Sequence, residues 1–227
     1  MDYGNVISNS FEYTKEALVG KWMQWVILAV MALVQTFTVS LIPLLSGYVV
    51  RVLAGNTPAP EIDGWGKLFV DGWKMNIIGL IYMIPAILIF LVLGGLSVIA
   101  GMATTDPAAA GAAILGAMAG AFLAFLVAIV MAFIALFAVL RFAHTDSVGE
   151  AFNFKAIFAQ IGALGWGTWI IAVIILLVIA LVYGFVVGIL GAIPLLGWLI
   201  ALFLNAAFAI FYARYLAQVY EEAPASA

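Results

Sequence analysis

Residues 114–140 read ILGAMAGAFLAFLVAIVMAFIALFAVL and contain no Asp, Glu, Lys, Arg or His. Four further stretches share this character, at residues 22–50, 77–100, 165–190 and 195–213. A helix needs about twenty predominantly apolar residues to cross the hydrocarbon core of a bilayer, and each stretch reaches roughly that length. The sequence therefore predicts an all-α fold, a polytopic transmembrane helical bundle of about five spans.

Composition supports this class and excludes others. The 227 residues are 67% hydrophobic and only 8% charged, whereas soluble domains carry about a quarter charged residues. Cysteine is absent, which removes disulfides, thiolate nucleophiles and thiolate metal sites. The formal net charge of −3 argues against a nucleic-acid partner. We expect no cofactor and no metal.

We expect a single integral membrane domain over residues 1–227, with amphipathic interfacial helices at the joints between spans. The spans are predicted at residues 22–54, 76–101, 107–142, 165–190 and 194–217. The interfacial helices are predicted at residues 5–21, 61–75 and 147–163, and a polar tail at residues 221–227.

The segment at residues 61–76, EIDGWGKLFVDGWKMN, is strongly amphipathic. One helical face carries Ile62, Trp65, Phe69 and Trp73, and the opposite face carries Asp63, Lys67, Asp71 and Lys74. Such a helix is typical of an anchor lying in the headgroup plane, with its aromatic rings at interfacial depth. The alternative is that its charged face is a docking site.

A second joint follows the third span. Ser147 and Glu150 have the spacing of a capping box, which predicts a helix that starts at Val148. The apolar residues that follow cover a wide arc of this helix: Phe152, Phe154, Ile157, Phe158 and Ile161.

The first apolar stretch has two interpretations. It can cross the membrane once, or it can double back at the polar residues that precede Pro43, namely Gln35, Thr36, Thr38 and Ser40. With five crossings and the N-terminus outside, six of the eight basic residues face the cytoplasm: Arg51, Lys67, Lys74, Arg141, Lys155 and Arg214. The positive-inside rule then predicts a cell-membrane protein with a cytoplasmic C-terminus.

Candidate functional residues are few because no span contains an ionisable side chain. Asn205 lies in the middle of the last span, where we expect an interhelical hydrogen bond. Gly116, Gly120, Gly184 and Gly188 give the small-residue spacing of close helix packing, within the chain or between copies in a homo-oligomer. His144, the one histidine, is interpreted as a surface residue rather than a metal ligand.

Most charges gather on the predicted cytoplasmic side. The candidate interfacial or partner face comprises Arg51, Asp63, Trp65, Lys67, Asp71, Lys74, Arg141 and Glu150. The mixture of signs is unlike the Lys- and Arg-rich runs that capture anionic lipid. It suits structural ion pairs or a protein partner at the cytoplasmic face.

Four segments carry a resemblance to a known family: GYVVRVL at 47–53, PAPEIDGWGKLFVDGWK at 58–74, RFAHTDSVGEAFNF at 141–154 and IPLLGW at 193–198. The chain resembles a prokaryotic, largely archaeal family of multi-pass membrane proteins that is known only as a domain of unknown function, DUF4013. The resemblance implies a membrane location and a shared helical plan, and it supplies no substrate, cofactor or catalytic residue.

We therefore expect a non-enzymatic integral membrane protein that organises the lipid bilayer or binds a partner. The alternative is a small channel or carrier for a neutral or apolar solute. A membrane enzyme would have to draw its catalytic groups from Asp63, Asp71, Arg141, His144 and Glu150 at the interface.

Overall fold

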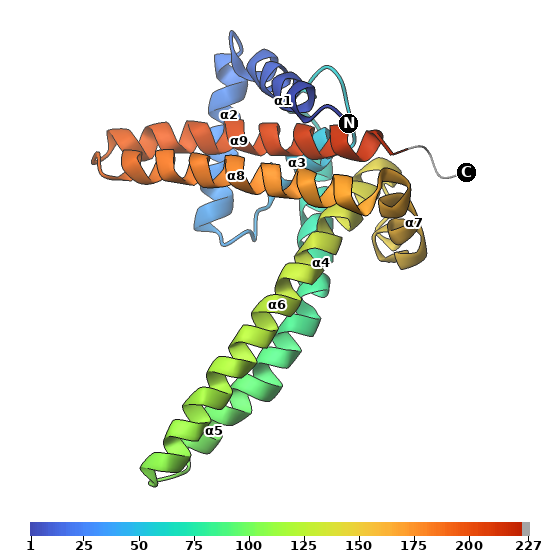
Figure 1. Cartoon of the computed structure of the whole chain (residues 1–227). Helices are drawn as coiled ribbons and strands as arrows, with labels where there is room; N and C mark the ends of the chain where they lie inside the picture. Colours follow the sequence, from blue (N-terminus) through green and yellow to red (C-terminus); the bar gives the residue numbers. More distant parts are fainter. Residues whose placement is uncertain (224–227) are drawn as a thin grey trace. The chain divides into compact units, whose positions relative to one another are not determined.

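The computed structural model describes residues 1–223, so the predicted polar tail at 221–227 lies outside the described residues from position 224 on. This part of the chain is helical, with no strand (Figure 1). In order, the α-helices are α1 (Tyr3–Leu18), α2 (Trp22–Phe37), α3 (Leu44–Leu53), α4 (Trp65–Ile89), α5 (Leu96–Met102), α6 (Pro107–Thr145), α7 (Phe154–Leu164), α8 (Trp166–Gly191) and α9 (Leu196–Glu221). A π-helical turn at Phe90–Gly95 joins α4 to α5, and a 3₁₀ turn at Gly149–Phe152 precedes α7.

Four helical segments are long and apolar enough to cross a membrane: Trp65–Met102, Pro107–Thr145, Trp166–Gly191 and Leu196–Glu221. A fifth is obtained if α1 and α2, which meet at a bend of 103°, count as one broken span. The all-α transmembrane class and the span count of about five are confirmed.

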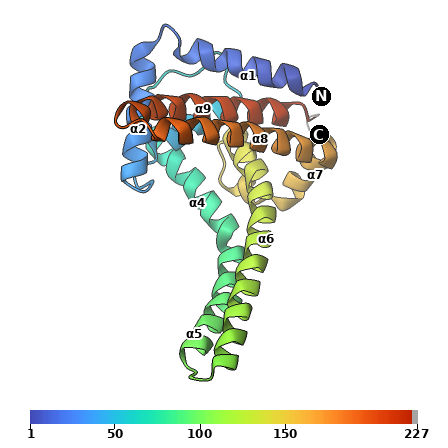
Figure 2. The same cartoon turned by 60° about the vertical axis from the view of Figure 1, so that its left-hand side comes forward.

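The chain divides into two compact units, the first made of residues 1–76 together with the chain from residue 138 on, and the second of residues 77–137. In the first unit, α9 packs against α1, α2, α3 and α8. Both views show α8 and α9 side by side (Figure 2). The buried alanines of α9 recur every three or four residues, at Ala206, Ala209, Ala213 and Ala217, and they let several helices approach one axis.

The first apolar stretch is not one continuous helix, so the predicted span at 22–54 is corrected in favour of a break. Gln35 stabilises the break. Its Oε1 accepts a hydrogen bond from the Ser46 backbone N–H at 3.0 Å, and its Nε2 donates to Ser46 Oγ at 2.9 Å. Val39 and Ser40 adopt positive φ, and Pro43 precedes α3. Gln35 thus satisfies the backbone at the start of α3, which an apolar setting requires.

The predicted interfacial helix at 61–75 and the predicted span at 76–101 share one helix, because α4 starts at Trp65 and runs without a break to Ile89. Between Trp73 and Ile78 no glycine or proline interrupts the helix. The second joint, after the third span, differs as well: α7 begins at Phe154 rather than Val148. Asn153 caps it by accepting the Ala156 N–H at 3.2 Å, while the Glu150 carboxylate that the capping box requires binds Arg141.

Glycines set the closest helix contacts in each unit. In the first, a Cβ on Gly47 of α3 would overlap the Leu68 backbone of α4, and one on Gly72 would overlap the Pro43 carbonyl. In the second, Gly120 lies against the Leu93 and Gly94 backbone, and Gly116 against Ser97. The ridge at Gly116 and Gly120 therefore packs within the chain. A Cβ at Gly184 or Gly188 would meet open space among the described residues.

The contact at Gly47 yields a stability prediction. Gly47→Ala should lower the free energy of unfolding by about 1–3 kcal/mol, because the added methyl group meets rigid backbone of α4 rather than a flexible side chain. Gly66→Ala is the matched control, since its new Cβ would meet nothing within 4 Å and alanine favours a helix by up to about 1 kcal/mol. Thermal unfolding of both variants in the same detergent measures the difference, and equal melting temperatures would contradict the close contact.

Candidate functional site

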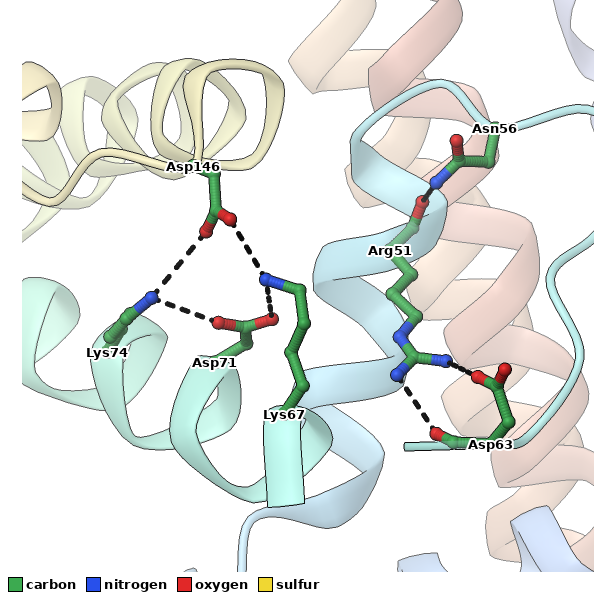
Figure 3. Close-up of polar contacts among 7 residues, drawn as sticks. All are labelled: Arg51, Asn56, Asp63, Lys67, Asp71, Lys74 and Asp146. Atoms are coloured by element: carbon green, nitrogen blue, oxygen red, sulfur yellow. Dashed lines mark hydrogen bonds and ion pairs between the residues drawn. The ribbon is translucent and has the colours of Figure 1, made fainter. Parts of the chain in front are cut away.

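Four charged side chains form a closed ring at the start of α4, which we call the α4 charge cluster: Lys67, Asp71, Lys74 and Asp146 (Figure 3). Lys67 Nζ lies 3.0 Å from Asp71 Oδ2 and 2.9 Å from Asp146 Oδ2. Lys74 Nζ lies 3.1 Å from Asp71 Oδ1 and 3.5 Å from Asp146 Oδ1. Each lysine contacts both carboxylates, so the cluster is internally neutral.

Helical spacing and one unusual backbone conformation assemble this cluster. Lys67, Asp71 and Lys74 follow one another at intervals of four and three, which places them on one face of α4. Asp146 follows the end of α6 with φ at 51°, a left-handed conformation that Asp and Asn tolerate better than most residues. That turn carries the Asp146 carboxylate to the two lysines.

Asp71 is the buried member of the cluster, whereas Lys67 and Asp146 are 55% and 62% exposed, so part of the charged face stays on the surface. The Asp71 side chain is 2% exposed and Leu68 is fully buried, whereas Trp65 and Phe69 are 48% and 40% exposed. The amphipathic pattern was read correctly as two opposite faces. Its orientation depends on Asp146, which lies far away in the sequence.

Arg51 of α3 makes a separate contact with the loop before α4. Its Nη1 lies 2.5 Å from Asp63 Oδ1, and its Nη2 donates to the Asp63 backbone carbonyl at 2.9 Å. The Asn56 amide in turn donates to the Arg51 carbonyl at 2.8 Å, as Figure 3 shows. Arg51 therefore fixes the connection from α3 to α4.

Arg141 lies in another polar group, with Glu150, Gln160 and Tyr220. Its Nε donates to Glu150 Oε2 at 2.7 Å and its Nη1 to Gln160 Oε1 at 3.3 Å. The Tyr220 hydroxyl donates to the same Gln160 oxygen at 2.8 Å. These bonds join α6, the 3₁₀ turn, α7 and α9. The sequence prediction placed Arg141 and Glu150 in one set with the α4 residues, and the structure gives them their own partners.

Sequence reasoning missed the polar stripe at the end of α9. Arg214, Gln218 and Glu221 recur at intervals of four and three, and that spacing was the available signal. The Arg214 guanidinium lies 5.1 Å from the Tyr13 ring centre, and Gln218 donates to Ser10 Oγ at 2.7 Å. This stripe therefore attaches α1 to α9.

His144 of α6 lies beside the end of α9, next to Tyr220 and Glu221. Its Nδ1 lies 2.9 Å from the Leu140 carbonyl, and its Nε2 lies 3.7 Å from Glu221 Oε1. The His144 and Tyr220 ring centres are 4.4 Å apart, with the ring planes tilted by 34°. The described residues hold no group of three or more His, Asp or Glu side chains able to bind a metal.

Two further polar residues of the spans lie apart. Asn205, in the last span, accepts a hydrogen bond from the Tyr183 hydroxyl of α8, which is an interhelical bond. Thr168, at the start of α8, accepts the Tyr3 hydroxyl on its backbone carbonyl at 3.1 Å.

Aromatic side chains cover the outer face of α7 and continue to Trp166, the first residue of α8. Phe154, Phe158 and Trp166 stack in a row with ring centres 6.5 and 6.0 Å apart, and they are 47%, 40% and 46% exposed. Ile157 and Ile161, on the opposite face, are fully buried. The short helix α7 thus resembles the start of α4, with aromatic rings outside and packing inside.

Apolar spans joined by short connections with internally paired charges define a multi-span α-helical membrane protein. The chain belongs to a family described as protein of unknown function (DUF4013), which it matches over residues 30–192. No curated protein and no solved structure matches it.

The buried carboxylate of the cluster gives a second prediction. Asp71→Asn should lower the free energy of unfolding by about 1–3 kcal/mol, because two lysines lose their shared charged partner. Asp63→Asn is the control: Asp63 is 79% exposed, and loss of such a pair costs less than about 1 kcal/mol. Urea unfolding in detergent micelles would report both values. A smaller effect at Asp71 than at Asp63 would show that the cluster contributes little to the fold.

The exposed carboxylates predict a dependence on pH. A hydrogen bond from Lys67 holds the pKa of Asp146 below its ordinary value of 3.8, and one from Arg141 holds the pKa of Glu150 below 4.5. Groups with lowered pKa values stabilise the folded state above their unfolded pKa, and this stabilisation is lost as the pH falls through the folded pKa. The melting temperature should therefore fall below about pH 4.5, and less so in an Asp146→Asn/Glu150→Gln double variant. Parallel acid transitions for the two proteins would refute this origin.

Proposed function

We propose that this protein is a non-enzymatic, membrane-organising protein that holds lipid at headgroup depth through outward-facing aromatic side chains. One observation carries the proposal: the start of α4 and the helix α7 both bury one face and leave aromatic rings exposed. Trp and other amphipathic aromatic residues favour the boundary between headgroups and hydrocarbon. Both segments then act as interfacial anchors.

The ion pairs of the α4 charge cluster help to decide whether the protein binds lipid or a protein partner. A protein that docks on the α4 charge cluster would have to compete with ion pairs already formed within the chain. The exposed Asp63, Lys67 and Asp146 remain a smaller surface for a partner at the cytoplasmic face. Lipid contact through the aromatic faces needs no such exchange, so the membrane-organising role has more support.

The same pairing supports a role without catalysis. Of the five groups that an interfacial enzyme would use, four lie in ion pairs within the chain: Asp63, Asp71, Arg141 and Glu150. The fifth, His144, has its Nε2 3.7 Å from Glu221 Oε1. General acids and bases must be free to reach a substrate proton. We place the protein in the cell membrane with its C-terminus in the cytoplasm, in accordance with the distribution of basic residues.

A second candidate is a carrier for a small neutral solute. It is favoured by a recess of about 150 Å³ between α2 and α9, lined by Leu33, Thr36 and Asn205 among others. Thr36 adjoins the break after α2, and Asn205 is the polar residue in the middle of the last span. Broken helices and polar residues in the middle of a membrane are features of transporters.

Vesicles of defined composition test the leading proposal. Wild-type protein should shift the diameter distribution of reconstituted vesicles relative to protein-free vesicles. A Phe154→Ser/Phe158→Ser variant should lose at least half of the shift, because polar side chains bind the interface more weakly. Phe122→Ser/Phe125→Ser is the matched control, since it removes two exposed phenylalanines from α6 in the second unit.

Cryo-imaging of the vesicles supplies the measurement, with gel filtration as a check of folding. Unchanged vesicles with wild-type protein, or equal loss in both double variants, would overturn the proposal. Swelling of the same vesicles in glycerol, abolished by Asn205→Leu, would transfer the support to the carrier.

A further inference from the structure

A groove with a volume of about 550 Å³ runs between α1 and the α8–α9 pair, within the first unit. Ile7 and Phe11 of α1 form one side, Val182 of α8 and Phe211 of α9 the other. Along its base, the Tyr183 and Phe208 rings stack with centres 4.1 Å apart and planes 3° from parallel. The groove is therefore a preformed hydrocarbon surface.

Of the three hydroxyl-bearing side chains that line the groove, Tyr183 and Thr14 already use their hydroxyl groups, and the third, Ser8, is exposed. The Tyr183 hydroxyl donates to Asn205 Oδ1, and the Thr14 hydroxyl donates to the Ser10 carbonyl at 2.8 Å. A water-soluble ligand would find few hydrogen bonds along these walls, whereas a hydrocarbon chain needs none. The outer surface of α8 beside the groove is strongly apolar, with Val182 60% and Leu181 73% exposed. The groove thus opens onto surface suited to lipid.

A positive charge on α1, that of Lys15, comes directly after Thr14, the last residue of α1 in the groove lining. Ile7, Phe11 and Lys15 are spaced by four residues, so they form one stripe along α1. Lys15 is exposed and has no ion pair among the residues that the structure describes. Glu12 follows Ser8, which also lines the groove, by four residues, so Glu12 lies on a neighbouring stripe of α1. Lysine can lay its methylene groups on apolar surface and direct its ammonium to a phosphate.

We propose that the groove binds one membrane phospholipid, with a hydrocarbon chain against Phe11 and Phe208 and its phosphate at Lys15. The proposal deepens the lipid-organising function proposed above and rests on it for the membrane setting. The site is distinct from the aromatic face of α7, because its walls come from α1, α8 and α9. Apolar walls together with one unpaired cation match the two chemical halves of a phospholipid.

Two variants separate the halves of the site. Ala207→Phe places a large side chain in the groove that Ala207 lines, and Lys15→Gln removes the charge while it keeps the length of the side chain similar. Their controls are Leu181→Phe, on the exposed surface of α8 outside the lining, and Lys155→Gln, an exposed lysine on α7. Gel filtration identifies any variant that fails to fold.

Native mass spectrometry of the delipidated protein titrated with phosphatidylglycerol is the test. Wild-type protein should retain one lipid. The midpoint concentration should rise about tenfold in Ala207→Phe and about threefold in Lys15→Gln, with both controls unchanged. If Ala207→Phe binds the lipid with the same midpoint concentration as the wild-type protein, the groove is not the lipid site. If Lys15→Gln does so, Lys15 does not contact the phosphate.

The same spectra report other occupants and keep the two proposals separate. A protein dimer that Ala207→Phe abolishes would show that a second copy covers the groove, and would overturn the lipid site. If Ala207→Phe loses the lipid but still changes vesicle diameters, the groove is supported and the aromatic faces alone organise the bilayer. If wild-type protein binds no lipid and still changes the vesicles, the groove fails while the broader function stands.

Discussion

The burial of Asp71 is the constraint on which the first unit depends. A carboxylate taken out of water needs a partner of opposite charge and hydrogen bonds to its oxygens. Lys67 and Lys74 supply both, and Asp146 occupies the remaining side of the two ammonium groups. This requirement orients the first turns of α4, positions the turn after α6, and leaves Trp65 and Phe69 outside.

Polar side chains elsewhere in the unit have a similar role. Each forms a hydrogen bond with a backbone or side-chain group that would otherwise lack a partner in apolar surroundings. Gln35 serves the start of α3, Asn153 the start of α7, and Gln160 the pair formed by Arg141 and Tyr220. Many charged side chains at the ends and joints of the helices are nevertheless exposed, among them Glu12, Lys67 and Lys155. The exposed surface of the membrane-spanning helices consists chiefly of aromatic and aliphatic side chains, which is the basis for the proposed function centred on lipid.

Hydropathy predicted the helical class and the later spans closely, because length and apolar character are properties of a local window. The polar run before Pro43 also indicated the break after α2. The orientation of the segment at 61–75 could not be predicted in the same way. Its two faces are visible in the sequence, but the choice of inner face is decided by Asp146, whose left-handed conformation no local pattern reveals. The capping box at Ser147 failed for a related reason, since Arg141 binds the glutamate that the motif requires.

The arrangement of the α4 charge cluster also bears on how the chain is made. Lys67 and Lys74 flank Asp71 within the same two turns of helix, so a nascent α4 can neutralise its carboxylate before any later helix exists. Asp146 is synthesised after the rest of α4 and one further membrane-spanning segment, α6. Lys67, Asp71 and Lys74 alone carry a net charge of +1, and Asp146 brings the cluster to neutrality once α6 has been synthesised.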